Sequence, residues 1–175
     1  DSGIPWISEI PEGWEVRKLK YISLIVMGQS PDTNLVNGEQ KGIPFFQGKA
    51  EFGKINPKPK SWILQPRKTA NKNDILFTVR APVGALNIAN KYCCIGRGLA
   101  AIKFTNSKYL YYVLHLTVKP LNIISSGSTF DAISVDQLKS ITIPYTENKS
   151  EQIAIANFLD KRIAKINVLI EKDKK

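Results

Sequence analysis

The sequence predicts an α+β protein, in which a β-rich body with a mixed or antiparallel sheet is followed by a long C-terminal α-helix of the coiled-coil type. Two patterns carry this prediction. Between residues 73 and 104, apolar and polar side chains alternate in three short runs, which is the period of a β-strand. From residue 148 onward, apolar residues recur at intervals of three and four, the period of a helix. We therefore expect a body over residues 1–147 and a helix over residues 148–175.

The stretch from residue 73 to residue 104 is expected to form the middle of the sheet. Its turns are Ala81-Pro82-Val83-Gly84 and Gly96-Arg97-Gly98, and turns favour proline and glycine. Arg80 stands at the edge of the first turn and Arg97 lies within the second. Both arginines should lie at strand ends, where a loop can present them to a partner. Pairing with Asp74 or with a backbone carbonyl is the structural alternative for each.

Further elements follow from local signals. Ser107 is placed to cap a helix over residues 107–116, and Pro120 is placed to end it. Prolines and turn residues exclude a regular helix between residues 48 and 72, which should form extended hairpins or a loop. The remaining predictions are a strand over residues 43–47, a polar loop over 125–129, a short helix from 134 to 138 and a strand over 141–145.

The composition is that of one cored, soluble, intracellular domain. A chain of 175 residues, 43% of them hydrophobic, can form a core without disulfides. Cys93 and Cys94 are adjacent, so on a strand they point to opposite faces and suit neither a disulfide nor zinc. We expect one core thiol and one half-exposed thiol in a reducing cytosol. No apolar run approaches the roughly 20 residues that span a bilayer. Since the chain begins at Asp1 and stops within a helical pattern, we expect an excised piece of a longer protein.

Positive charge is concentrated in one part of the chain. The net charge is +10, and residues 51–110 contain 11 basic and 2 acidic side chains. No carboxylate occurs between Glu51 and Asp74, where basic residues accumulate beside Trp62. Such a zone suits phosphate neutralisation with added base-edge contacts. A solvated lysine-rich loop is the alternative interpretation.

The C-terminal pattern predicts a helix that pairs with another helix. Asn148 can cap it, with Glu151 three residues further on. The apolar residues follow the spacing of a coiled-coil seam, and 25 residues at about 1.5 Å each reach about 37 Å, further than the body requires. The seam consists of Ala156, Leu159, Ile163, Ile166 and Ile170.

Catalytic patterns are weak in this sequence. His115 is the only histidine, and on an apolar helix it is expected to be a partly buried structural residue and not a base or a ligand. Asp32, followed by Glu39 and Lys41, imitates the two acids and lysine of metal-dependent nucleases. The surrounding asparagines and glycines indicate a flexible loop instead of the paired core strands that such a site needs. The aromatic-x-Gly-x-Gly and Asn/Asp-Pro-Pro-aromatic patterns of adenine methyltransferases are missing. We predict no metal site.

Several segments, in order along the chain, resemble the specificity (S) subunit of bacterial type I restriction-modification systems. They are SGIPWISEIPEGWEVRKL at residues 2–19, IPFFQG at 43–48, RAPVG at 80–84, CIGRG at 94–98, GSTF at 127–130 and SEQIAIANFLD at 150–160. The resemblance implies a DNA target-recognition domain followed by the start of the conserved spacer helix, which in the family packs antiparallel against a second such helix.

The resemblance also implies partners and a cytoplasmic location. In the family, two such domains read the halves of a bipartite DNA site and dock methyltransferase (M) subunits that methylate adenine N6, and a restriction (R) subunit joins them. S-adenosylmethionine, ATP and Mg²⁺ would belong to those partner subunits, so this chain is expected to bind no cofactor and to catalyse no reaction. The chain departs from the family by holding one recognition domain and a partial helix. It is therefore half of a subunit, or a natural half-subunit that dimerises.

Candidate contact residues follow from placement and chemistry. Arg80 and Arg97 are candidate base readers because of their turns. An alternative function is a non-catalytic basic module that binds RNA or an acidic protein. The other DNA candidates are Lys54, Lys58, Lys60, Arg67 and Lys68 for phosphates, and Gln29, Ser30, Gln47 and Lys49 for base edges; the partner-facing residues of the helix are Leu159, Ile163, Ile166 and Ile170.

Overall fold

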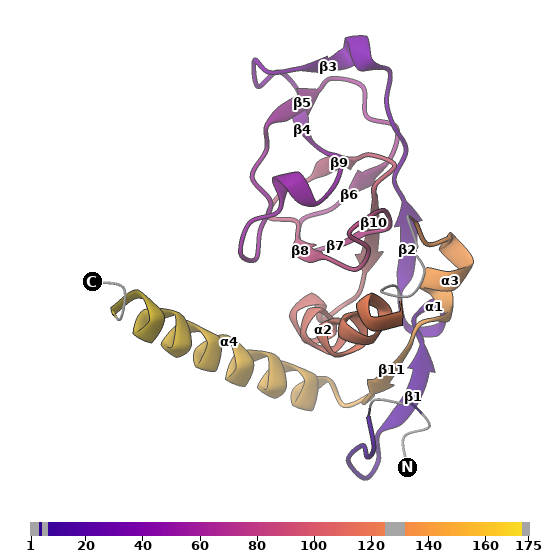
Figure 1. The fold of residues 1–175 in the computed structure, drawn as a ribbon, viewed down its shortest axis with the longest axis vertical. Coiled ribbons are helices and arrows are strands. Elements are labelled where there is room, and N and C mark those ends of the chain that lie inside the picture. The colour runs from indigo at the N-terminus through magenta and orange to yellow at the C-terminus, as the bar shows by residue number, and fades with distance from the viewer. Residues whose placement is uncertain (1–3, 5–6, 125–131, 173–175) are drawn as a thin grey trace.

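The computed structural model describes residue 4 and residues 7–124 and 132–172 of the chain. It confirms the predicted α+β class: a β-rich body is followed by one long helix that extends away from it (Figure 1). The predicted loop at residues 125–129 and the GSTF segment lie outside the described residues. In the described part of the chain, no helix is long and apolar enough to cross a membrane.

A four-stranded antiparallel sheet forms the centre of the body. Its strands are β2 (Leu24–Met27), β10 (Leu99–Lys103), β7 (Ile75–Thr78) and β8 (Leu86–Ile88), in that spatial order. In the register, Ala100 lies opposite Phe77 on one side and Met27 on the other. Three of the four strands come from the stretch predicted to form the middle of a sheet.

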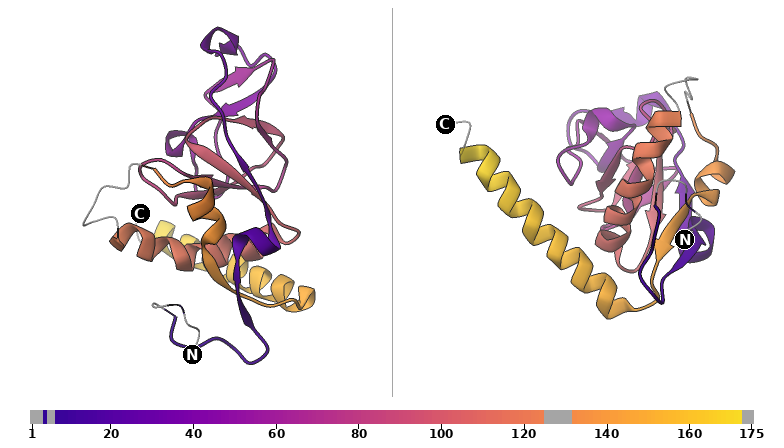
Figure 2. Two further views of the ribbon diagram at one scale, coloured as in Figure 1. Left: turned by 90° about the vertical axis from the view of Figure 1, so that its right-hand side faces the viewer. Right: turned by 60° about the horizontal axis from the view of Figure 1, so that its bottom comes forward.

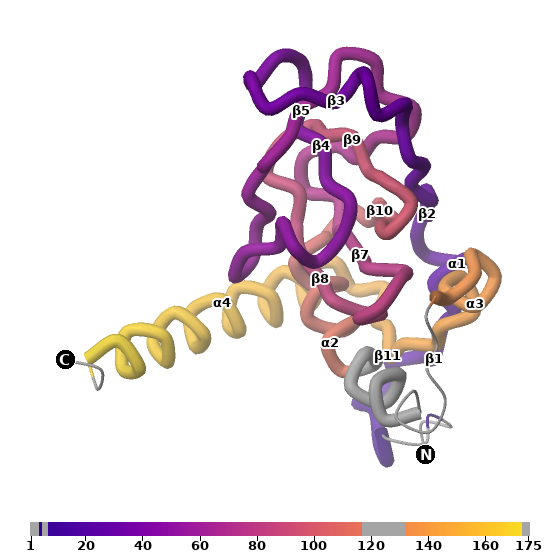
Figure 3. Tube along the Cα trace, turned by 45° about the horizontal axis from the view of Figure 1, so that its top comes forward, coloured from indigo at the N-terminus to yellow at the C-terminus, as the bar shows by residue number. Residues whose placement is uncertain are grey.

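A second, mixed sheet of five strands occupies the end of the body farthest from β1 and β11 (Figures 1 and 3). The strand between Cys93 and Ile95, β9, pairs in parallel with β4 and antiparallel with β6. The three strands predicted in residues 73–104 share the central sheet, whereas β9, which lies between them in the sequence and was not predicted, joins this second sheet. In spatial order the strands are β3 (Val36–Asn37), β5 (Ser61–Ile63), β4 (Ile43–Phe46), β9 (Cys93–Ile95) and β6 (Thr69–Ala70).

The two ends of the body sequence meet in a small antiparallel sheet. Strand β1 (Glu15–Lys18) pairs with β11 (Thr142–Tyr145). A short helix, α1 (Leu19–Ile22), follows β1, and another, α3 (Val135–Ser140), precedes β11. Ser134 caps α3, since its Oγ accepts a hydrogen bond from the N–H of Gln137 at 3.2 Å. This sheet brings the N-terminal segment next to the residues that begin the long helix.

Helix α2 (Ser107–Ile124) packs its apolar face on the central sheet. Leu110, Val113 and Leu114 are buried. Two details of the prediction are wrong. Asn106 caps the helix instead of Ser107, because its Oδ1 accepts from the N–H of Tyr109 at 3.4 Å, and Ser107 Oγ donates to Phe104 O instead. The helix also continues through Pro120, because a proline removes one helical hydrogen bond without excluding a helical φ.

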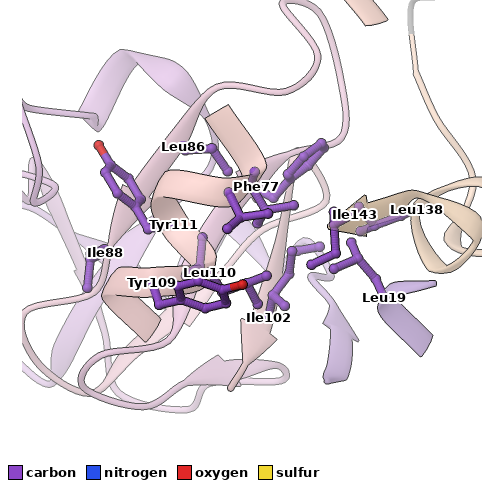
Figure 4. Close-up of a cluster of buried hydrophobic side chains, with 14 of the residues drawn as sticks. Leu19, Phe77, Leu86, Ile88, Ile102, Tyr109, Leu110, Tyr111, Leu138 and Ile143 are labelled. Atoms are coloured by element: carbon purple, nitrogen blue, oxygen red, sulfur yellow. The ribbon is translucent and has the colours of Figure 1, made fainter. Parts of the chain in front are cut away.

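Buried apolar side chains fill both sides of the body. The largest cluster joins the central sheet, α2, α3 and β11 (Figure 4). The prediction that one of the two cysteines is half-exposed is wrong, because strand β9 lies between two further clusters. Cys93 packs with Phe46, Cys94 packs with Phe45, and both thiols are fully buried. Burial raises the pKa of the Cys93 thiol to about 12, so this thiol is not a reactive thiolate at neutral pH.

The C-terminal helix α4 (Lys149–Lys172) begins where the cap was predicted. Asn148 Oδ1 accepts from the N–H groups of Ser150 and Glu151, both at 3.1 Å. The first half of α4 packs against the body through Gln152 and Ala156, which are buried. Its second half extends away as a straight rod (Figure 2).

Candidate nucleic-acid interface

Loops from four parts of the chain meet beside the two main sheets. The loop after β2 is held by hydrogen bonds from the N–H of Gly28 to Leu99 O (2.8 Å) and from the N–H of Gln29 to Ile95 O (3.1 Å). The turn between β9 and β10 is held by a bond from the N–H of Gly96 to Phe46 O at 2.8 Å. The backbone therefore ties together loops that are far apart in the sequence.

A hollow of about 230 Å³ opens between three of these loops. The side chains of Lys49, Arg80 and Arg97 bring three positive charges to it, and its lining contains no carboxylate. All three cations are exposed. The hollow is lined by Gln47, Gly48, Lys49, Thr78, Arg80, Ala81, Arg97 and Gly98.

The two arginines are not used to neutralise Asp74. The Asp74 carboxylate accepts a hydrogen bond from the N–H of Asn71 at 2.7 Å, and burial raises the pKa of this carboxyl while the charge of Lys103 acts to lower it. Within the described part of the chain, neither Arg80 nor Arg97 forms an ion pair. Their guanidinium groups are therefore available to an anionic or hydrogen-bond-accepting ligand.

Two glycines allow the loops of the hollow to approach closely. A Cβ atom at Gly98 would lie 2.2 Å from Gln47 O, and one at Gly28 would lie 2.1 Å from Gly96 O. Neither place has room for a side chain. By contrast, a Cβ atom at Gly48 would have no atom within 4 Å. Gly28 and Gly98 are thus required by contact, whereas Gly48 only takes part in the lining.

Thr78 shapes the loop that presents Arg80. Its Oγ1 donates to Pro82 O at 2.6 Å and accepts from the N–H of Ala85 at 2.8 Å. Gly84 adopts φ +88°, a conformation that glycine reaches without strain. The segment RAPVG, part of the resemblance to specificity subunits, is therefore a tight loop at the edge of the hollow.

The predicted contact residues divide into three groups. Gln47, Lys49, Arg80 and Arg97 line the hollow, and Gln29 and Ser30 are exposed on the adjoining loop. Lys58 and Lys68 are exposed but do not line the hollow: the Lys58 N–H donates to Glu51 O (2.8 Å), and Lys68 O accepts from the N–H of Ile95 (2.9 Å). Lys60, also exposed, directly precedes β5.

Two of the predicted phosphate contacts have acidic partners. Arg67 Nη2 donates to both carboxylate oxygens of Asp32 at 3.1 Å. Lys54 Nζ lies 3.7 Å from the Glu171 carboxylate and thus faces α4 instead of the hollow. The same contacts account for the nuclease-like residues, because Asp32 pairs with Arg67, and Glu39 pairs with Lys41 at 2.6 Å. Among the described residues, no group of three acids, cysteines or histidines could hold a metal ion.

The partner-facing candidates on α4 differ in exposure. Leu159 is half-buried against the body, whereas Ile163, Ile166 and Ile170 are 36%, 53% and 47% exposed. The spacing of apolar residues did not indicate a second exposed row of side chains on α4. Phe158 and Leu169 form this row, with Arg162 between them. Eleven residues make about three helical turns, so Phe158 and Leu169 share one line along the helix.

His115 has a local role. Its Nδ1 lies 2.8 Å from Tyr111 O, one helical turn earlier, and its ring meets the Tyr111 ring edge-on, with the centroids 4.4 Å apart. This contact satisfies one imidazole nitrogen through its own helix. The structural role predicted for His115 agrees with these contacts, but the prediction of partial burial is wrong, because the residue is exposed.

The fold and the hollow together define an α+β module with a basic face and a long, partly exposed helix. The model of the type I restriction modification DNA specificity domain matches residues 11–175. The chain belongs to this family, as the resemblance predicted.

Individual relatives agree with the family match. The chain is 45% identical, over 94% of its length, to 39% of a putative type I restriction enzyme MjaX specificity subunit of Methanocaldococcus jannaschii. It is 31% identical, over 93% of its length, to 42% of a putative type I specificity subunit, S.MgeORF438P, of Mycoplasma genitalium. The chain thus spans less than half the length of each of these relatives.

Solved structures agree in fold. The HsdS subunit from Thermoanaerobacter tengcongensis superposes with a TM-score of 0.81 at 38% identity, covering 94% of this chain and 41% of that one. A chain from a study of complex assembly and conformational transition of the type I R-M system superposes with a TM-score of 0.83 at 41% identity, over 93% of this chain and 41% of that one.

Proposed function

We propose that this chain is a sequence-specific DNA-recognition unit that reads one half of a bipartite site for a type I restriction-modification complex. The observation that carries the proposal is the hollow, where three exposed cations meet without a carboxylate in the lining. Duplex DNA supplies phosphates for such cations and base edges for the amide and guanidinium groups beside them. The negatively charged DNA and the basic face of the chain are complementary in charge.

The hollow combines two kinds of recognition group. Arg80 and Arg97 are placed on tight loops whose backbone is fixed by hydrogen bonds, so each guanidinium can offer a two-pronged contact to a guanine edge. Gln47 and Gln29 can make the corresponding contact to adenine. Lys58, Lys60 and Lys68 are exposed and supply further positive charges suited to phosphates.

The exposed face of α4 serves assembly. Ile163, Ile166 and Ile170 form a seam for a second helix, supplied by another recognition half or by a second copy of this chain. The adjacent row of Phe158 and Leu169 widens the apolar surface beyond a two-helix seam, which supports docking of a methyltransferase subunit on the same helix.

In this proposal the chain performs no chemistry itself. Methylation of adenine N6 with S-adenosylmethionine would occur in the M subunit, and ATP and Mg²⁺ would serve the R subunit. The complex would work in the cytoplasm, where its DNA lies. The chain contributes the choice of site and the geometry that holds the catalytic subunits there.

A competing function is the binding of RNA or of an acidic protein by the same basic face. Titration of the chain with random duplex DNA, over a range of salt concentrations, distinguishes the two. Duplex binding that weakens steeply with salt supports the proposal, because each neutralised phosphate releases counterions. Indifference to duplex DNA, with tight binding of RNA or an acidic protein, would contradict it. Mapping modified adenines after co-expression of the complete subunit with its methyltransferase then identifies the site.

A further inference from the structure

Helix α4 is attached to the body first at its N-terminal end. The Glu151 carboxylate accepts from Trp14 Nε1 at 3.0 Å and from Thr146 Oγ1 at 2.8 Å. The buried Gln152 side chain donates to Thr146 O at 2.7 Å. These bonds, and the burial of Ala156 one turn later, hold the first two turns of the helix. The direction of the remainder depends on what is attached further along.

A second attachment lies about two turns further along the helix. Asp160 is half-buried, and its carboxylate accepts hydrogen bonds from Lys108 Nζ and from Tyr112 Oη, both on α2. Burial acts to raise the pKa of Asp160, but the bonds from Lys108 and Tyr112 and the charge of Lys108 outweigh it and lower the pKa. The carboxylate is therefore ionised and held by two donors.

Beyond Asp160 the helix has little support. Apart from Asn167, which is half-buried, every described residue from 161 to 172 is exposed. The remaining polar contact is between Glu171 and Lys54, which lie 3.7 Å apart and are 71% and 80% exposed. Exposed pairs of this kind are screened by water and contribute little to stability. Asp160 is thus the last firm contact between α4 and the body.

The space beside α4 leaves the helix room to swing. A groove of about 670 Å³ separates it from the body, and its lining includes Ile88 and Tyr111 from the body and Ile153 from α4. Lys108, Tyr112 and Asp160 also line this groove. Packed side chains do not fill this groove. The contact of Asp160 with Lys108 and Tyr112 therefore sets the distance between its two walls.

We propose that Asp160 is a positioning residue that fixes the direction of α4 relative to the recognition body, and thereby the spacing between the two half-sites that a complete assembly reads. The second part rests on the proposed function, in which α4 connects two recognition units.

Small rotations of α4 about its attached end displace its far end by more than the spacing of base pairs in DNA. From Gln152 to Lys172 the helix rises about 30 Å. A tilt of about 10° about its attached end moves the far end by about 5 Å, which exceeds the rise of about 3.4 Å per base pair. Loss of the Asp160 contact should therefore allow half-site intervals that differ by one base pair.

The orientation can be measured without DNA. Spin labels on cysteines introduced at Ser140 and Lys165, both exposed, report the distance between body and helix, and the buried Cys93 and Cys94 escape labelling. Labelled chain is diluted with unlabelled chain. We expect a narrow distance distribution in the parent and a broader or shifted one in Asp160→Ala, Lys108→Met and Tyr112→Phe. The matched control, Glu171→Gln, removes the carboxylate of the Lys54 contact at the far end of α4 and should leave the distribution narrow.

Several outcomes overturn the inference. Unchanged distances in all three variants would show that Asp160 does not fix the direction of α4. Equal broadening in Glu171→Gln would show that Asp160 matters no more than the Lys54–Glu171 contact. Should Asp160→Ala fail to fold, the two α2 variants still test the contact, and exchange of the charges in Lys108→Asp with Asp160→Lys should restore a narrow distribution.

The spacing is tested separately in the complete specificity subunit with its methyltransferase, by mapping modified adenines in the parent and in Asp160→Asn. We expect the variant to modify additional sites whose half-site interval differs by one base pair. An unchanged interval, despite a broadened helix orientation, would overturn the link to spacing. Absence of specific modification in the parent would instead contradict the proposed function and leave the label distances as evidence on the contact.

Discussion

At the scale of single residues, Arg97 gives the most direct test of base recognition. It is exposed at the hollow and forms no ion pair with a described residue, so its removal should cost little stability. If Arg97 contacts a guanine edge, Arg97→Ala should lose about 1–3 kcal/mol on the specific site and little on random duplex. Arg17→Ala, which removes an arginine from β1, is the control for charge alone. Lower melting temperature with specificity retained would mark Arg97 as scaffold.

Gly98 tests whether close approach of the loops forms the site. In Gly98→Ala the new methyl group would meet Gln47 O at 2.2 Å, so the turn and the β4 loop must separate. We expect weaker DNA binding with most of the melting temperature retained. Gly48→Ala changes the same lining but meets no atom within 4 Å, so its binding should match the parent. Equal effects of the two substitutions in a binding titration would contradict this assignment.

The sequence identified Gln47, Lys49, Arg80 and Arg97 as separate candidates, and the fold brings them to one hollow. The sequence could not show which of the other candidates are already paired. Arg80 and Arg97 were found from turns at strand ends, a local signal that tertiary structure preserved. The Asp32–Arg67 pair joins residues 35 positions apart, and the Lys54–Glu171 pair joins the body to the distal helix. Such ion pairs form between residues that only the folded structure brings together, and no local pattern in the sequence predicts them.

At the scale of elements, α4 should mediate association through its exposed seam. Ile163→Asp with Ile166→Asp places charges among residues that a partner helix would bury, so we expect loss of dimerisation in sedimentation experiments while the body stays folded. Lys161→Asp with Lys165→Asp, on other lines of the same helix, is the control. A monomer at hundreds of micromolar for the unmodified chain, or a dimer unaffected by the isoleucine changes, would refute the seam.

The contact between α4 and α2 should also depend on pH. Because the pKa of Asp160 is lowered in the folded protein, this carboxyl contributes stability that is fully present above its unfolded pKa of about 4. That contribution is lost as the pH falls through the lowered folded value. Unfolding by denaturant at several pH values should therefore give a stability difference between the parent and Asp160→Asn at pH 7 that shrinks in acid. A difference independent of pH would show that ionisation is irrelevant to the contact.

Elements were predicted well where one signal dominated. The cap at Asn148 and the period of three and four located α4, and alternation located the three strands β7, β8 and β10. Strand β9 shows the limit: it was not among the predicted strands, and its pairing with β4 depends on contacts some 50 residues away. The same placement explains why neither thiol is half-exposed, since a strand between two apolar clusters has no solvent face.

At the scale of the whole molecule, the exposed basic residues between Lys58 and Lys68 should set the salt dependence of DNA binding. Reversal of charge at Lys58, Lys60, Arg67 and Lys68 removes up to four phosphate contacts, so the slope of log affinity against log salt should fall by about 3 to 4 units. The paired state of Arg67 favours the lower figure. Reversing four lysines elsewhere, at Lys18, Lys20, Lys149 and Lys161, gives the same change in net charge. A slope altered equally by both sets would assign the effect to net charge and not to a defined surface.

The hollow also bears on how a new specificity could evolve. Each of its recognition groups arrives on a separate loop, and backbone hydrogen bonds and glycine contacts, which do not depend on the identity of those side chains, hold the loops in place. A substitution at Gln47, Arg80 or Arg97 therefore leaves the supporting core unchanged. Under the proposed function, each such substitution would change one base preference while the protein stays folded, so DNA specificity would change in small, individually viable steps.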